Sequence, residues 1–474
     1  MNKALKGPFI KSNNKTSKMM FHLTICLIAL ALFSFYKNGF IPYYNNKTNL
    51  YGMFYPLIML LTTSLTTQIT EALYVRLFLK KKGKDLIEYL KNSYGFIPGL
   101  FLGLMLPINT PTYALIFGGF MAIVVGKMLF GGFGNNIFNP ALIGALFITA
   151  TYSLAITNNG GYLNLYEVDT VSGATPLSNV VEGIGTYETL VSPYGNLWNF
   201  FIGTIPGSLG ETSALICLIG FVYLTLTKTI KPLIPTFYIS TVFVLTFIIG
   251  ISNGLGIWYP LFQVLSGGLL FGAIFMATDP VTSPTTKIGQ ILYGLCLGLL
   301  TITFRYLTSY PEGVMTSILT MNMLVFLLDK IGAKAKFNLK KSIIPFIVII
   351  LLMTTITINI SNSYKVDTTV DKNFSIVDVK ENKNKVTYTV TQKGYESTLT
   401  GEIVIEKGKV TSFEITNQND SFYQKVEDAD YINYLLKNQS DLENVDTVSG
   451  ATYSSTGVLK MIQNTLKDYG ENYE

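Results

Sequence analysis

The chain has 474 residues, of which 49% are hydrophobic and 14% are charged, and its mean hydropathy is +0.39. Outside the C-terminal tail, its basic residues lie mostly near the N-terminus and in short loops between apolar runs, so the net charge of +6 gives no indication of nucleic-acid binding. Three cysteines without paired spacing and a single histidine argue against a disulfide framework, a zinc knuckle and a histidine-ligated metal or haem site built by this chain alone.

The first 360 residues contain apolar runs long enough to cross a bilayer as helices. We predict eleven membrane spans, approximately at residues 19–37, 52–79, 96–107, 112–128, 139–156, 211–227, 233–250, 261–277, 288–304, 314–329 and 342–360. The first span follows a basic stretch, but no small-residue cleavage site follows it, so a retained helix is expected rather than a signal peptide. The sequence therefore predicts an α-helical polytopic membrane protein.

Lysine-rich segments near the N-terminus and around residues 80–91, 228–231 and 330–341 all fall on one face of this arrangement. The positive-inside rule makes that face cytoplasmic, with Arg305 as the exception on the outer side. The predicted location is the cytoplasmic (inner) membrane, with the N-terminus inside and the C-terminal tail outside.

Two glycine-rich segments, residues 131–139 and 267–279, end in Asn-Pro and Asp-Pro. Glycine permits tight bends and proline ends helices, so both segments are candidates for broken helices that line a polar site. If spans one to five and six to ten are inverted repeats, the two breaks are expected at equivalent places. The alternative is that the glycines only allow close helix packing.

Acidic residues at membrane depth are few. Glu71 is expected to pair with Arg76 in its own helix, whereas Glu211 and Asp279 at span ends are candidates for a cation or proton path. Lys127 is interpreted as an anchor that reaches the cytoplasmic interface rather than as a catalytic base.

The tail, residues 361–474, has the composition of a soluble domain. Residues 385–390 and 401–405 alternate as strands do, residues 406–409 suit a hairpin turn, and residues 427–438 and 455–469 are predicted helices.

The heptapeptide DTVSGAT occurs twice, at residues 169–175 in a predicted outer loop and at residues 446–452 in the tail. The flanking residues differ, which favours a short modification signal over a duplicated domain, while the alternative is a pair of ordinary Ser-Gly turns. The final threonine of each copy offers a hydroxyl for phosphate attachment. Helix starts are expected just after each copy, at Pro176 and at Ser454 or Ser455 as cap, where free N–H groups would face a phosphate.

Asp-x-x-Ser-Gly-Ala-Thr resembles the signal read by flavin transferase, which joins FMN through its phosphate to the last threonine. Residues 127–141, 207–213 and 267–284 resemble the RnfD subunit of the Rnf ion-translocating ferredoxin:NAD oxidoreductase complex and its relative NqrB, from the sodium-pumping NADH:quinone reductase. The tail resembles the FMN-binding domain of the RnfG subunit. It is shorter than a full RnfG subunit, and the motif of RnfG commonly has a different residue before the glycine. The chain is thus either an RnfD–RnfG fusion or an RnfD with an additional FMN module.

The spans and breaks predict about ten helices in two inverted repeats and one anchor helix, and the resemblance implies a small α+β FMN-binding domain after them. The expected divisions are a membrane domain at 1–335, a linker and helix at 336–364, and an extracytoplasmic domain at 365–474. Thr175 and Thr452 would carry covalent FMN, and riboflavin would bind non-covalently among the helices. The remaining motif residues implied in cofactor binding are Asp169, Ser172, Gly173, Ala174, Asp446, Ser449, Gly450 and Ala451.

The implied function is that of a flavin-carrying, electron-transfer subunit of an ion-translocating complex, not an enzyme by itself. Its implied partners are iron–sulfur subunits, flavin transferase and membrane lipid, with no nucleic acid, and the coupled ion is Na⁺ or H⁺. The alternatives are an NqrB-like part of a sodium-pumping quinone reductase, a flavin conduit to external electron acceptors, and a transporter without redox function.

Overall fold

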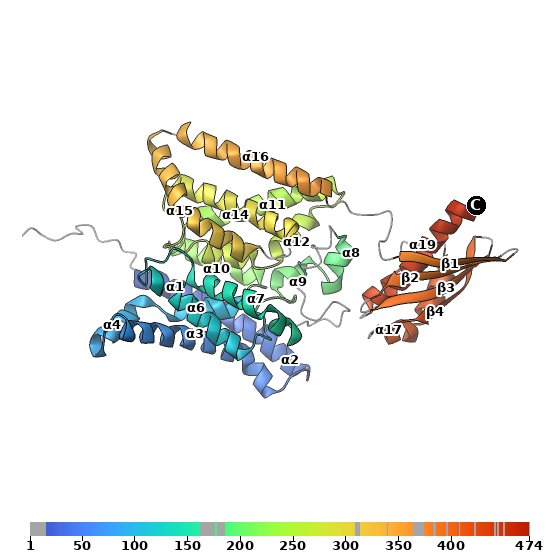
Figure 1. Ribbon diagram of the computed structural model, residues 1–474, viewed down its shortest axis with the longest axis horizontal. Coiled ribbons are helices and arrows are strands. Elements are labelled where there is room, and N and C mark those ends of the chain that lie inside the picture. The colour runs from blue at the N-terminus through green and yellow to red at the C-terminus, as the bar shows by residue number, and fades with distance from the viewer. Residues whose placement is uncertain are drawn as a thin grey trace, which may run out of the picture. The chain divides into compact units, whose positions relative to one another are not determined.

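The computed structural model describes residues 16–161, 176–177, 185–308, 313–338, 340–363, 374–382, 385–394, 397–406, 408–420, 423–439, 442, 445–448 and 451–473. The described residues divide into a membrane unit, which includes those up to Ser363, and a tail unit, which includes those from Phe374 onward (Figure 1). Each unit has its own packed interior and is described separately.

The first half of the membrane unit contains five of the predicted spans. Its elements are α1 (Thr16–Phe35), continued by η1 (Tyr36–Phe40) and α2 (Ile41–Tyr44), then α3 (Leu50–Leu77), the short α4 (Gly83–Ser93), α5 (Phe96–Met105), α6 (Thr112–Val124), η2 (Met128–Phe130) and α7 (Pro140–Asn158). Three short helices follow, α8 (Tyr187–Leu190), η4 (Ser192–Tyr194) and α9 (Leu197–Ile202).

The second half contains α10 (Ala214–Leu226), α11 (Leu233–Ser252), α12 (Trp258–Leu265), α13 (Leu269–Phe271), η5 (Gly272–Met276), α14 (Lys287–Leu307) and α15 (Val314–Phe337). The last helix, α16 (Lys340–Ser363), lies beside α11 and α14 (Figure 1). Among the described residues, eight helices are long and apolar enough to cross a membrane, one further pair is bent by 63°, and α5 and α10 are shorter. These helices correspond to the predicted spans, so the helical membrane fold is confirmed.

The two halves repeat one pattern of neighbours. In the first half α3 packs against α5 and α6, and α6 packs against α7; in the second, α11 packs against α12 and α14, and α14 against α15. The bent pair α12–η5 is therefore the counterpart of the short α5. The bend at Gly267 is not equivalent to the loop at residues 131–139, which joins α6 to α7, so that part of the prediction is wrong.

Helix α5 and the bent pair run in opposite directions across the interface between the halves. The rings of Phe101 and Phe271 meet midway with centroids 6.0 Å apart. At one end, Ile97 near the start of α5 and Asp279 just after η5 line the same cavity. At the other end, the Gly210 amide donates to the Leu104 carbonyl over 2.8 Å. This antiparallel arrangement is the one expected of inverted repeats with five spans each.

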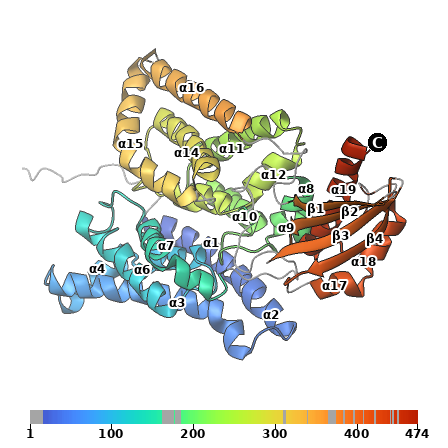
Figure 2. The ribbon, with the colours of Figure 1, turned by 45° about the vertical axis from the view of Figure 1, so that its right-hand side comes forward.

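The tail unit is an antiparallel sheet in the order β1-β2-β3-β4, formed by Phe374–Asn382, Lys385–Lys393, Thr398–Glu406 and Lys409–Asn417 (Figure 2). Alternate residues of β2 and β3 point to a buried core that also contains Val458 and Ile462 of α19 (Thr452–Tyr473). The predicted strands and the hairpin that pairs Glu406 with Lys409 are confirmed.

The helix predicted at residues 427–438 is two helices, α17 (Tyr423–Asp428) and α18 (Tyr431–Lys437). Asp430 between them has φ +47°, a left-handed conformation that interrupts the helix. The predicted helix at 455–469 exists, but α19 begins earlier, at Thr452.

Candidate functional site

The first DTVSGAT copy lies outside the described residues. No geometry is therefore given for Asp169, Ser172, Gly173, Ala174 or Thr175. The next two residues, Pro176 and Leu177, form a buried turn. Leu177 Cδ2 lies 3.2 Å from the place that a Cβ on Gly267 would take, so the chain just after this copy packs at the bend between α12 and α13.

The second copy leads directly into α19. Asp446 is exposed, Ala451 is fully buried, and Thr452 is the first residue of the helix, while Ser449, Gly450 and the Thr452 side chain lie outside the described part. The first-turn N–H groups of a helix and its dipole favour a phosphate at this end. The start of α19 at Thr452 therefore presents backbone groups of the kind that favour a phosphate.

The prediction that Ser454 or Ser455 caps α19 is wrong, because the helix starts at Thr452, two residues before Ser454 and three before Ser455. Both serines are fully buried in the first turn. Ser455 Oγ accepts from the Val448 amide over 3.2 Å and donates to the Ala451 carbonyl over 2.8 Å, which holds the motif segment against the helix. Ser454 Oγ donates to the buried carboxylate of Asp420 over 3.0 Å.

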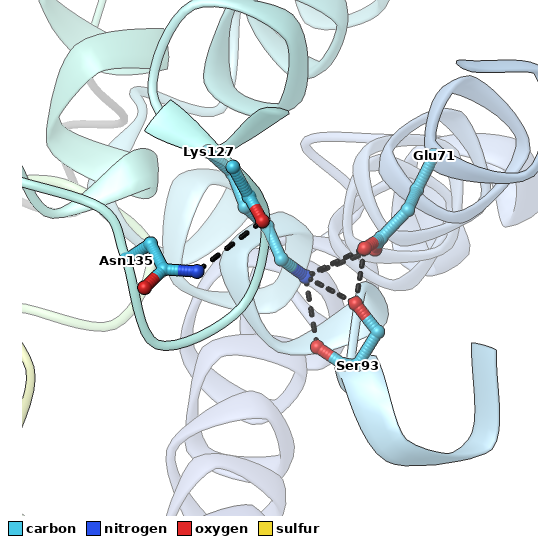
Figure 3. A network of polar contacts seen from close by, with 5 residues as sticks. Glu71, Ser93, Lys127 and Asn135 are labelled. Atoms are coloured by element: carbon cyan, nitrogen blue, oxygen red, sulfur yellow. Dashed lines mark hydrogen bonds and ion pairs between the residues drawn. The ribbon is translucent and has the colours of Figure 1, made fainter. Parts of the chain in front are cut away.

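A buried ion pair lies where the glycine-rich segment begins in the membrane unit. Lys127 Nζ lies 2.9 Å from Glu71 Oε1 and donates to the Ser93 carbonyl and hydroxyl, each over 2.8 Å (Figure 3). Ser93 Oγ also donates to the Glu71 carboxylate. The exposed fractions of the Lys127 and Glu71 side chains are 2% and 0%. Both predictions for these residues are wrong: Glu71 pairs across helices rather than with Arg76, and Lys127 does not reach the interface.

The ion pair borders a cavity of about 90 Å³ between the two halves. Its lining is mostly apolar and aromatic, with Tyr94 and Phe133 on one side and Asp279 on the other. The partly buried Asp279 carboxylate accepts from Thr282 Oγ1 over 3.0 Å. Asp279 thus lies at a polar end of the interface between the two halves.

Glu211 lies at the opposite end of the same interface. A Cβ on Gly268 would lie 2.7 Å from its carboxylate, so glycine at the bend leaves room for this side chain. The adjacent Thr212 accepts from Lys37 Nζ over 2.9 Å, and Lys37 also donates to the Ile205 carbonyl over 2.5 Å. The two predicted ion-path residues are therefore not neighbours; they flank the crossing of α5 and the bent pair.

Sequence reasoning missed the roles of two buried cations. Arg305 donates from Nη1 to the Gln263 carbonyl over 2.5 Å and from Nη2 to the Ser266 carbonyl over 3.2 Å. These carbonyls belong to the end of α12, where the bend removes their helical partners. Lys37 likewise donates to the Ile205 carbonyl and to the Thr212 hydroxyl in the irregular loop before α10. The signal in the sequence that could have indicated these roles was a basic residue at the end of a span, facing a glycine-rich break.

Two family models match the chain. The NQR2, RnfD, RnfE family model matches residues 3–338, and the FMN-binding domain model matches residues 394–467. The second match includes the second DTVSGAT copy.

Similar proteins carry names from two kinds of complex. The RnfD subunit of the proton-translocating ferredoxin:NAD(+) oxidoreductase complex of Clostridium ljungdahlii is 34% identical over 71% of this chain and 96% of its own length. Its counterpart in the Na(+)-translocating complex of Acetobacterium woodii is 36% identical over 52% of this chain and 73% of its own. The NqrB subunit of the Na(+)-translocating NADH-quinone reductase of Chromohalobacter salexigens is 33% identical over 56% and 62%.

Proposed function

The chain belongs to the NQR2, RnfD, RnfE family, and we propose that it is the flavin-bearing membrane subunit of an ion-translocating ferredoxin:NAD oxidoreductase. One observation carries the proposal. A single polypeptide joins a region similar to RnfD over nearly the full length of that subunit to an FMN-binding domain, and each part contains the same seven-residue motif. Two flavin sites in one chain suit electron transfer better than transport alone.

Each motif is proposed to receive FMN on its last threonine, Thr175 or Thr452. Flavin transferase would use a flavin dinucleotide: the bond from threonine Oγ to phosphorus forms, the pyrophosphate bond breaks, the nucleoside monophosphate leaves, and the hydroxyl proton passes to a base or water. The transferase would recognise the other motif residues, which would then surround the phosphate. These residues are Asp169, Ser172, Gly173, Ala174, Asp446, Ser449, Gly450 and Ala451.

We propose that both motifs face the extracytoplasmic side and that the chain is divided at residues 335 and 364. The lysine distribution supports this orientation. The antiparallel arrangement of α5 and the bent pair gives further support. Asp279 lies at one end of the interface between the two halves, and Leu177, just after the first motif, lies at the other end.

FMN supplies the redox chemistry, while the chain fixes its position and surroundings. In the proposed order, electrons from an iron–sulfur partner enter at Thr452, pass to Thr175 and cross inward, with a non-covalent riboflavin as the implied acceptor among the helices. No described side chain is assigned to riboflavin.

Asp279 and Glu211 are proposed to lie on the cation path, because acidic groups at membrane depth mark such paths. In proteoliposomes containing the whole complex, we expect Asp279→Asn and Glu211→Gln to lower ion uptake driven by ferredoxin oxidation by about tenfold or more, with covalent flavin unchanged. Uptake is measured separately for Na⁺ and for H⁺, because the relatives' names include both ions.

Glu88→Gln, an exposed acid on α4, is the control and should leave uptake unchanged. Wild-type uptake by both the Asp279 and the Glu211 variants would remove these residues from the path.

The proposed activity is tested by purifying the tagged chain from its native membrane. The expected result is co-purification with iron–sulfur subunits and reduction of NAD by reduced ferredoxin. NADH-dependent quinone reduction without ferredoxin activity would instead favour the quinone reductase relative. Reduction of external acceptors alone would favour a flavin conduit.

A further inference from the structure

In the tail, one buried carboxylate joins three parts of the chain. Asp420 is 6% exposed and follows β4. Its Oδ1 accepts from the Ser397 amide over 2.7 Å and from the Ser397 hydroxyl over 2.9 Å, at the turn between β2 and β3. Its Oδ2 accepts from Ser454 Oγ over 3.0 Å, in the first turn of α19.

The surroundings of Asp420 are shaped for this carboxylate. A Cβ on Gly394 would overlap Asp420 Oδ2, so a side chain there would displace the carboxylate. The Gly394 amide donates to the Ser397 carbonyl over 2.8 Å, which closes the turn. The Asn419 amide donates to Ser397 Oγ over 3.0 Å, so the serine that binds Asp420 is itself fixed.

These contacts bear directly on Thr452. Ser454 lies two residues after Thr452 in the same helical turn, and Ser455 ties that turn to Val448 of the motif. Ser455 thus holds the turn from within the motif's own segment, whereas Asp420 holds it from the sheet. The Asp420 carboxylate thus connects the start of α19 to the β2–β3 turn.

We propose that Asp420 is a positioning residue that presents Thr452 for attachment of FMN. This inference rests on the proposed attachment of FMN to Thr452. The hydrogen bonds of Asp420 join the Ser397 turn to the first turn of α19, so their loss is expected to loosen the turn that carries Thr452 and to leave its hydroxyl poorly placed.

The test uses the full chain in a Thr175→Ala background, so that all covalent flavin reports on Thr452. Purified chain is incubated with flavin transferase and flavin dinucleotide, and in-gel fluorescence gives the initial labelling rate. We expect Asp420→Ala and Ser454→Ala to label about tenfold more slowly. Asp420→Asn should label near the wild-type rate, because its amide can accept from Ser397 and donate to Ser454 Oγ.

Two controls separate positioning from folding. Asp428→Asn, which changes an exposed acid on α17, should label as the wild type does. In a Thr452→Ala background, Asp420→Ala should leave the labelling of Thr175 unchanged. The resistance of the tail to trypsin is measured for every variant as a check of folding. Ser454→Ala is the decisive variant, because it removes the contact with Asp420 with the smallest change in packing.

Wild-type labelling rates in Ser454→Ala and Asp420→Ala would overturn the role of Asp420 while leaving attachment at Thr452 intact. Slow labelling only in variants whose tail is digested would also overturn it, since the effect would then be one of folding. A Thr175→Ala chain that takes no label at all would overturn attachment at Thr452, and the role of Asp420 with it.

Discussion

We expect a chain in which both Thr175 and Thr452 are replaced by alanine to carry no covalent flavin, and each single replacement to leave one of the two labels. The physical reason is that the threonine hydroxyl is the only atom in either motif proposed to form the bond to phosphorus. The measurement is ultraviolet fluorescence of the denatured chain after electrophoresis, normalised to protein, with flavin transferase co-expressed.

The matched controls are Thr170→Ala and Thr447→Ala, which remove the other threonine of each motif. Both should remain fluorescent at the wild-type level. Fluorescence in the double variant would mean that flavin is attached elsewhere. A dark wild-type chain, with a transferase that labels a known substrate, would reduce both motifs to turns and favour the transporter without redox function.

The membrane helices could be predicted from the sequence because an apolar run of bilayer length has few other stable structures. Strands β2 and β3 of the tail were equally accessible, since residues 385–390 and 401–405 alternate between polar and apolar side chains. Strands β1 and β4 were not predicted. The break at Asp430 could not be predicted, because a single residue in the left-handed conformation hardly changes the pattern of apolar residues.

The partners of buried charges could not be predicted from sequence spacing. Glu71 has a nearby arginine in its own helix, yet it pairs with Lys127, 56 residues away. Membrane burial decides this, because two charges inside the protein are tolerable only when each neutralises the other. Asp420 was missed for a similar reason: its contacts join segments 23 and 34 residues away.

The pair formed by Glu71 and Lys127 leads to the second large expected effect. Glu71→Gln alone leaves a buried ammonium group without its counter-charge, and Lys127→Met alone leaves a buried carboxylate. We expect either change to destabilise the membrane unit by about 3–5 kcal/mol, seen as a lower midpoint of thermal denaturation in detergent.

The double variant, Glu71→Gln with Lys127→Met, should recover most of that loss, because neither charge then remains and glutamine can still bond to Ser93. Lys91→Met, on the exposed side of α4, is the control and should leave the midpoint unchanged. Additive losses in the double variant would show that the two residues do not act as a pair. Recovery of stability without recovery of ion uptake would indicate that the two charges are needed for transport as well as for folding. The reason is that a neutral pair of similar size restores packing but does not restore a charged lining to the cavity beside Asp279.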